Sequence, residues 1–148
     1  MSAGPLRVLV AEDEEHLGTL VAQFLRGRGL DVTLERDGAA AAARLAAEPF
    51  DVALVDVQMP GLDGLAVLER ARALARPPEV IVATGNGVGE ASLAALRGGA
   101  YVAVAKPYRM AEIELLLRRA AETRRLRDEV TALRAEVAAL RSGGAGRG

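Results

Sequence analysis

The sequence predicts an α/β fold: a doubly wound, five-stranded parallel sheet built from five strand–helix repeats, with an extended last helix. Four short apolar runs rich in Val and Ala are too short for helices and are typical of buried strands. Segments with helical spacing lie between these runs. Strands that alternate with helices at this interval form right-handed units of a parallel sheet covered on both faces.

The composition limits the classes of function. The chain of 148 residues has room for one ordinary domain and an appendage. A net charge of -1 gives no overall attraction to nucleic acid or to an anionic membrane. The absence of cysteine excludes disulfides and thiolate metal ligands, and no apolar run approaches the roughly 20 residues of a membrane-spanning helix. We therefore expect a cytoplasmic protein with no direct contact to nucleic acid or membrane.

The expected strands follow from the apolar pattern in chain order. One weaker segment alternates polar and apolar residues, as expected for a strand at an exposed edge of the sheet, and spans Asp31–Glu35. The four runs expected as buried strands are Leu6–Ala11, Val52–Val55, Val80–Ala83 and Tyr101–Ala105.

The expected helices end at glycine or proline. They span Glu15–Arg28, Ala39–Ala47, Leu65–Ala75 and Glu90–Arg97. Asp63 precedes the third of them and is expected to cap it. A pattern of Arg, Glu, Leu and Ala then runs from about Arg109 to Ser142. We expect a domain over residues 1–120, a helical extension over 121–141 and a flexible tail over 142–148.

Polar residues follow the buried strands. Glu12 and Asp13 follow the first, Asp56 the third, Thr84 the fourth and Lys106 the fifth. In a doubly wound sheet, ligands lie beyond the carboxyl ends of the strands, so these side chains should meet at one edge. Three carboxylates gathered there repel one another, and a hard divalent cation with oxygen ligands is the simplest compensation. The pattern predicts a Mg²⁺ site.

A phosphoryl-transfer role follows from the same set. A carboxylate beside Mg²⁺ and an ammonium group can attack phosphorus, because the cations neutralise charge on the transferring oxygens. Asp56 is central enough for this role. Lys106 would contact one phosphoryl oxygen and the Thr84 hydroxyl another. Solvated loop carboxylates would explain each acid alone but not the whole set.

Four motifs carry a family resemblance over residues 6 to about 120. Ala11–Glu14, Asp56–Gly64, Thr84–Gly85 and Lys106–Tyr108 resemble the signatures of the receiver domains of two-component response regulators. The resemblance implies a flavodoxin-like fold and phosphorylation by a sensor histidine kinase or a phosphotransfer protein. The sequence carries no signature of a substrate pocket, so we expect no enzymatic turnover of outside substrates.

The resemblance also implies a role for each site residue. Asp56 would be the phosphoacceptor and a Mg²⁺ ligand, with Asp13 a direct ligand and Glu12 acting largely through water. The backbone carbonyl of Gln58 would supply a third protein oxygen. Thr84 would be the switch hydroxyl, and the Lys106-Pro107 peptide bond would be cis.

One position departs from the receiver pattern. Receivers usually carry Tyr or Phe three residues before the lysine, where this chain has Ala103. Tyr101 matches a position seen in receivers of enhancer-binding activators, and on a strand it would share the face of Ala103. We hypothesise that motion of Thr84 reaches the surface between the fourth helix and the fifth strand without a ring at position 103.

The helical extension has a heptad pattern. Its a positions are Thr123, Val130 and Val137, and its d positions are Leu126, Leu133 and Leu140. β-Branched a residues with Leu at d favour a parallel two-stranded coil. In such a coil the g and e residues of two chains pair as Glu122 with Arg127, Glu129 with Arg134 and Glu136 with Arg141. We expect a homodimer; a single helix packed on its own domain is the alternative.

The leading hypothesis is a response regulator whose phosphorylation at Asp56 changes the receiver surface and the arrangement of a dimer. A dimeric scaffold that works without phosphorylation is one alternative, prompted by Ala103. A second is the N-terminal fragment of a transcriptional activator, prompted by the receiver followed by a basic helix at Arg124–Arg127. The sequence does not specify the downstream partner.

Overall fold

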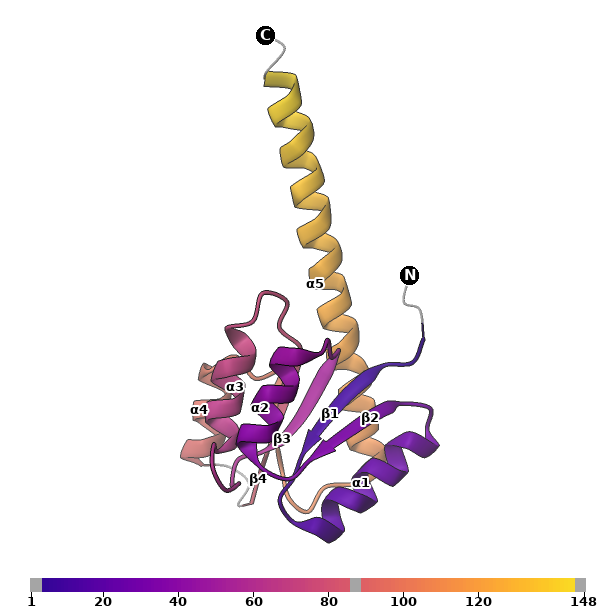
Figure 1. Cartoon of the computed structure of the whole chain (residues 1–148), viewed down its shortest axis with the longest axis vertical. Helices are drawn as coiled ribbons and strands as arrows, with labels where there is room; N and C mark the ends of the chain where they lie inside the picture. The colour runs from indigo at the N-terminus through magenta and orange to yellow at the C-terminus, as the bar shows by residue number, and fades with distance from the viewer. Residues whose placement is uncertain (1–3, 86–88, 146–148) are drawn as a thin grey trace.

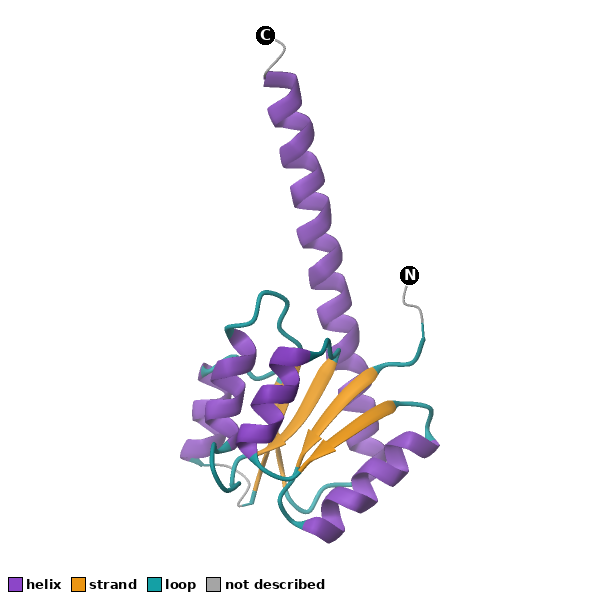
Figure 2. Cartoon of the chain, in the orientation of Figure 1, coloured by secondary structure: helices purple, strands orange, loops and turns teal. Residues whose placement is uncertain are grey.

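The computed structural model describes residues 4–85 and 89–145. Within these ranges, five strands alternate with five helices, and all neighbouring strands pair in parallel in the order β2-β1-β3-β4-β5. Figure 2 shows the strands side by side in one sheet with helices around it. The strands are β1 (Arg7–Ala11), β2 (Asp31–Glu35), β3 (Val52–Asp56), β4 (Glu79–Thr84) and β5 (Val102–Ala105). The helices are α1 (Glu15–Gly27), α2 (Gly38–Ala47), α3 (Gly64–Arg72), α4 (Glu90–Arg97) and α5 (Met110–Ala145). The predicted fold class is confirmed.

Helices cover both faces of the sheet (Figure 1). On one face, α1 and α5 enclose a core that includes Val10, Leu25 and Leu117. On the other face, α2, α3 and α4 enclose a second core around Leu9 and Val67. Neighbouring residues of one strand enter opposite cores because successive side chains point to opposite faces. The central strands must therefore be apolar throughout, which is why they were visible in the sequence.

The edge strands differ from the central ones in burial. β2 lies at one edge, as its sequence predicted, but its exposure alternates only at its start: Asp31 is exposed, Val32 is buried and the next three residues are partly buried. β5 was expected to be buried, and this was wrong: its first three residues are only partly buried and Ala105 is exposed. β5 is the other edge of the sheet, so it lacks a neighbouring strand on one side.

Tyr101 and Ala103 do not share a face. Tyr101 lies in a bend before β5 and packs with the core under α1 and α5, whereas Ala103 packs with the core under α2, α3 and α4. The prediction assumed strand alternation between the two residues. That alternation does not reach Tyr101, because β5 begins only at Val102.

The third helix begins and ends as local hydrogen bonds dictate. The Asp63 carboxylate accepts from the Ala66 N–H at 2.9 Å, which confirms the predicted cap. The helix ends at Arg72 and not at Ala75 as predicted. The N–H of Leu74 donates to Ala71 at 3.2 Å, three residues back, and this tighter turn ends the α-helix.

The last helix extends far beyond the sheet (Figure 1). We call residues 122–145 the stalk. The helix continues to Ala145, four residues past the predicted end of the extension at residue 141. The flexible tail over residues 142–148 stays a prediction. Glycine weakens a helix without blocking it sterically, whereas proline would have ended it. Residues 146–148 lie outside the described part, and the boundary between domain and extension near residue 120 stays a prediction. In the described residues, no helix is both long and apolar enough to cross a membrane.

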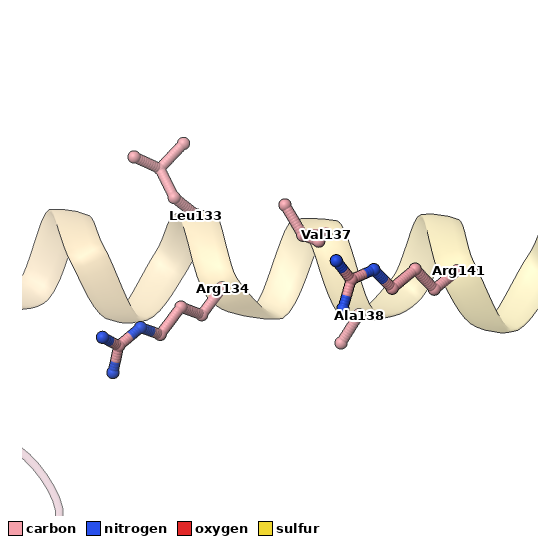
Figure 3. A pocket seen from close by; sticks show the side chains of 5 residues that line it. All are labelled: Leu133, Arg134, Val137, Ala138 and Arg141. Atoms are coloured by element: carbon pink, nitrogen blue, oxygen red, sulfur yellow. The ribbon is translucent and has the colours of Figure 1, made fainter.

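The apolar stripe of the stalk is open to solvent. Its side chains are between 45% and 71% exposed and comprise Leu126, Val130, Leu133, Val137 and Leu140. Leu133 and Val137 project from the same side of the helix (Figure 3). The alternative of a helix packed on its own domain is therefore wrong.

Candidate functional site

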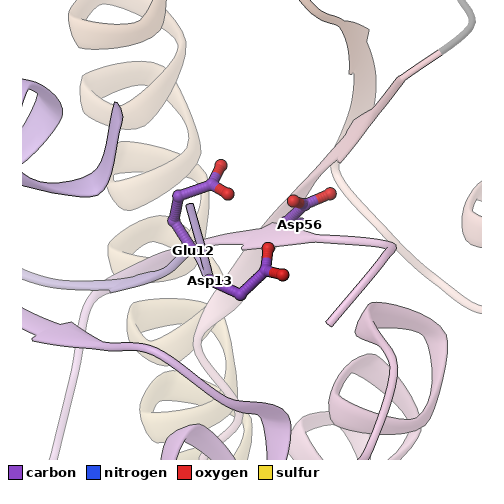
Figure 4. A group of neighbouring side chains, drawn as sticks. All are labelled: Glu12, Asp13 and Asp56. Carbon is purple, nitrogen blue, oxygen red and sulfur yellow. The ribbon is translucent and has the colours of Figure 1, made fainter. Parts of the chain in front are cut away.

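The carboxyl ends of the strands bring the predicted site residues together. Glu12 and Asp13 follow β1, and Asp56 ends β3. One carboxylate oxygen from each of these three residues lies within 4.8 Å of the others, and Figure 4 shows the three side chains grouped at this edge. Glu12 and Asp56 are buried, whereas Asp13 is exposed. The site is thus open on the side of Asp13.

Lys106 joins the two buried acids. Its Nζ donates to Glu12 Oε1 at 2.6 Å and to Asp56 Oδ2 at 2.7 Å. Burial raises the pKa of Glu12 above its usual value, even though the bond from Lys106 lowers it. Burial alone would lower the pKa of Lys106, but its bonds to Asp56 and Glu12 raise it overall. The lysine therefore stays an ammonium group beside Asp56.

Backbone groups orient the acids. Asp56 Oδ1 accepts from the Gln58 N–H at 3.2 Å, and Glu12 Oε2 accepts from the Glu14 N–H at 3.1 Å. Each acid thus presents one oxygen to Lys106 and the other to a backbone amide of the loop that follows its strand. Gln58 lies two residues after Asp56, in the loop that follows β3.

Thr84 and Lys106 connect the two strands that border the site. The Thr84 hydroxyl donates to the carbonyl of Val104 at 3.4 Å, and the Lys106 N–H donates to the carbonyl of Thr84 at 2.8 Å. The Lys106-Pro107 peptide bond is cis, as the resemblance implied. A displacement of Thr84 would therefore disturb these hydrogen bonds to Val104 and Lys106 and so affect β5.

The donor set fits a magnesium ion. It offers three carboxylates, all hard oxygen ligands, with no nitrogen or sulfur ligand among them. Three negative charges face one ammonium group, so the cluster keeps an excess of negative charge that a divalent cation would compensate.

Sequence reasoning gave no role to Tyr108. This side chain is partly buried against the core under α1 and α5. Burial, reinforced by the charge of Glu12, raises the pKa of Tyr108 to about 12. Its position directly after Lys106-Pro107 was the available signal. The sequence also places Asn86 two residues after Thr84, where it would flank the site, but Asn86 lies outside the described residues.

This strand order, with acids and one lysine at the carboxyl ends of the strands, defines the chain as a phosphoacceptor signalling domain. The sequence model of the response regulator receiver domain family matches residues 8–118, so this chain belongs to that family. It is a homologue of the phosphoacceptor response regulators of two-component systems.

Two relatives place the chain within the family. It is 34% identical over 143 residues to the C4-dicarboxylate transport transcriptional regulatory protein DctD of Rhizobium meliloti, covering 97% of this chain and 31% of that protein. It is 33% identical over 129 residues to the nitrogen assimilation regulatory protein NtrX of Azorhizobium caulinodans, covering 86% of this chain and 28% of NtrX. The chain thus spans about a third or less of these two relatives. The predicted resemblance to receivers of enhancer-binding activators is confirmed.

A solved structure supports the same assignment. The receiver domain of the sensor histidine kinase PA1611 from Pseudomonas aeruginosa is 30% identical, with a TM-score of 0.74 over 81% of this chain and 99% of that domain. That structure has a magnesium ion coordinated in its active site cleft.

Proposed function

We propose that Asp56 is the phosphoacceptor of this receiver and that Mg²⁺ bound at the acidic cluster is required for the transfer. The contact between the Lys106 ammonium and Asp56 Oδ2, at 2.7 Å, carries the proposal. The Lys106 ammonium offsets negative charge on the Asp56 carboxylate, and the same group can contact an oxygen of an incoming phosphoryl group. Asp13, Asp56 and the carbonyl of Gln58 would hold the ion, with Glu12 acting through water.

The proposed step is a simple displacement at phosphorus. A carboxylate oxygen of Asp56 forms a bond to the phosphorus while the bond between phosphorus and the histidine nitrogen of the donor breaks. The electron pair of that bond stays on the nitrogen. Bound Mg²⁺ supplies charge neutralisation at the phosphoryl oxygens. Lys106 contacts one of these oxygens, and the Thr84 hydroxyl turns toward another.

Phosphorylation would change the surface through Thr84. The phosphoryl group adds about −1.5 to −2 charges at the site. A Thr84 hydroxyl drawn toward it would leave the carbonyl of Val104, its acceptor at 3.4 Å, and so release a contact with β5. Because Ala103 has no ring, the change would reach the surface of α4 and β5 without an aromatic side chain at this position.

We also propose that the stalk pairs with a second copy as a parallel coiled coil. An exposed stripe of Val and Leu over three heptads is stable in water only if another apolar surface covers it. Glu129 with Arg134 and Glu136 with Arg141 are opposite in charge across such an interface. Phosphorylation would then change the arrangement of the two receivers relative to the coiled coil that joins them. The chain would act through protein contacts, fed by a histidine kinase or phosphotransfer protein, and would turn over no outside substrate.

Native mass spectrometry with Mg²⁺ and a small phosphodonor tests both proposals. We expect one phosphoryl group per chain, lost in Asp56→Asn, on a species of two chains. An intact dimer that gains no phosphoryl group would favour a scaffold that works without phosphorylation. A monomer at all concentrations would contradict the coiled coil.

A further inference from the structure

An ion pair joins the root of the stalk to the receiver. The guanidinium of Arg127 binds the carboxylate of Glu79, the first residue of β4. The Glu79 side chain is 4% exposed, whereas that of Arg127 is 47% exposed. Removal of Arg127 would leave a buried carboxylate without this partner, whereas the arginine could turn to solvent.

Further polar contacts surround this pair. The buried guanidinium of Arg124 donates to the carbonyl of Pro77 at 3.3 Å and to Asp51 at 3.4 Å. Asp128 pairs with Arg76 at 3.1 Å. Asp51 directly precedes β3, and Glu79 is the first residue of β4. The first turns of the stalk are therefore bonded to the amino ends of the two strands that carry Asp56 and Thr84.

Arg127 therefore has two competing partners. In the heptad pattern it occupies an e position, where a parallel dimer would pair it with Glu122 of the partner subunit. Glu122 is exposed, and pairs between exposed charges contribute little. Separating a buried carboxylate from its cation costs much more. The balance favours Glu79.

We propose that Glu79 withholds Arg127 from the second copy, so that the charge pairing of the dimer begins at Glu129 and Arg134. Arg127, the e residue of the first heptad, then pairs with the receiver and not with the second chain of the coil. This inference rests on the proposed dimer. It corrects the pairing of Glu122 with Arg127 that the heptad pattern alone predicts.

The test is a double-mutant cycle on the dimer dissociation constant, measured by analytical ultracentrifugation. Glu79→Gln keeps the shape of the side chain but removes its charge, which frees Arg127 for Glu122 of the partner subunit. We expect the dissociation constant to fall roughly fourfold, because two exposed pairs form per dimer. Glu122→Gln should change nothing in the natural chain and should cancel the gain in the Glu79→Gln background.

Glu129→Gln is the matched control. Glu129 is exposed, occupies the equivalent g position one heptad later, and should weaken the dimer roughly fourfold in both backgrounds. Glu122 and Glu129 are both on the surface, so their two variants fold even if Glu79→Gln does not. If Glu122→Gln weakens the natural dimer as much as Glu129→Gln does, the inference about Arg127 is overturned, but the proposal that the chain is a dimer still holds. A natural chain that is always monomeric would instead refute the dimer itself.

Discussion

Replacement of Gly64 by Ala tests how the phosphoacceptor strand is supported. Gly64 begins α3, and its N–H donates to the carbonyl of Val57 at 2.9 Å. A Cβ atom at this position would lie 2.3 Å from the carbonyl oxygen of Asp56 and 2.8 Å from the Cα of Val57. Both neighbours are backbone atoms, so no side-chain rotation can relieve the overlap.

The expected cost follows from this geometry. Overpacking of a filled interior costs about 1–3 kcal/mol, and a collision with backbone belongs at the upper end. A loss of about 3 kcal/mol lowers the midpoint of thermal unfolding by roughly 6–12 °C for a chain of this size. Because the displaced carbonyl belongs to Asp56, the rate of phosphorylation should fall as well.

Gly27→Ala is the matched control. Gly27 lies in the last turn of α1, and no atom lies within 4 Å of its added Cβ. This change should raise the free energy of unfolding by about 0.4–1 kcal/mol, because Ala restricts the unfolded chain more than Gly does. Urea unfolding of the three proteins measures both effects. A Gly64→Ala variant as stable as Gly27→Ala would refute the reasoning from close backbone packing.

Three further predictions concern charge. Lys106→Ala should abolish phosphorylation. It should also increase the stabilisation of the folded protein by Mg²⁺, because the three acids lose the lysine that offsets their charge. The shift in the thermal unfolding midpoint on addition of Mg²⁺ measures this effect. Burial would raise the pKa of Glu114, but its pairs with Arg118 and Arg28 lower it below 4.5, so its stabilisation is present above that pH and lost as pH falls through the lowered value. Urea midpoints should therefore fall less on acidification in Glu114→Gln, and an equal fall would contradict the pair. The phenol of Tyr108 should ionise only near pH 12, which its ultraviolet absorbance reports against Tyr108→Phe; ionisation near pH 10 would contradict its burial.

The sequence by itself determined the fold class and the membership of the site. Val-rich strands alternating with amphipathic segments permit few packings, and parallel strands place Asp13, Asp56 and Lys106 at one edge whatever the details of the core. The exposed heptad stripe was equally visible, because periodicity is a local property of the chain.

Only the tertiary structure decided which partner each charged group meets. Heptad spacing gives Arg127 a partner in a second chain, but the fold brings the buried Glu79 to it from 48 residues away. The same applies to Lys106, which bridges Glu12 and Asp56 across separations of 94 and 50 residues. Strand alternation likewise failed at Tyr101, where the start of β5 set the orientation of the side chain. Periodicity describes one element at a time, whereas the cost of burying a charge depends on what other elements bring beside it.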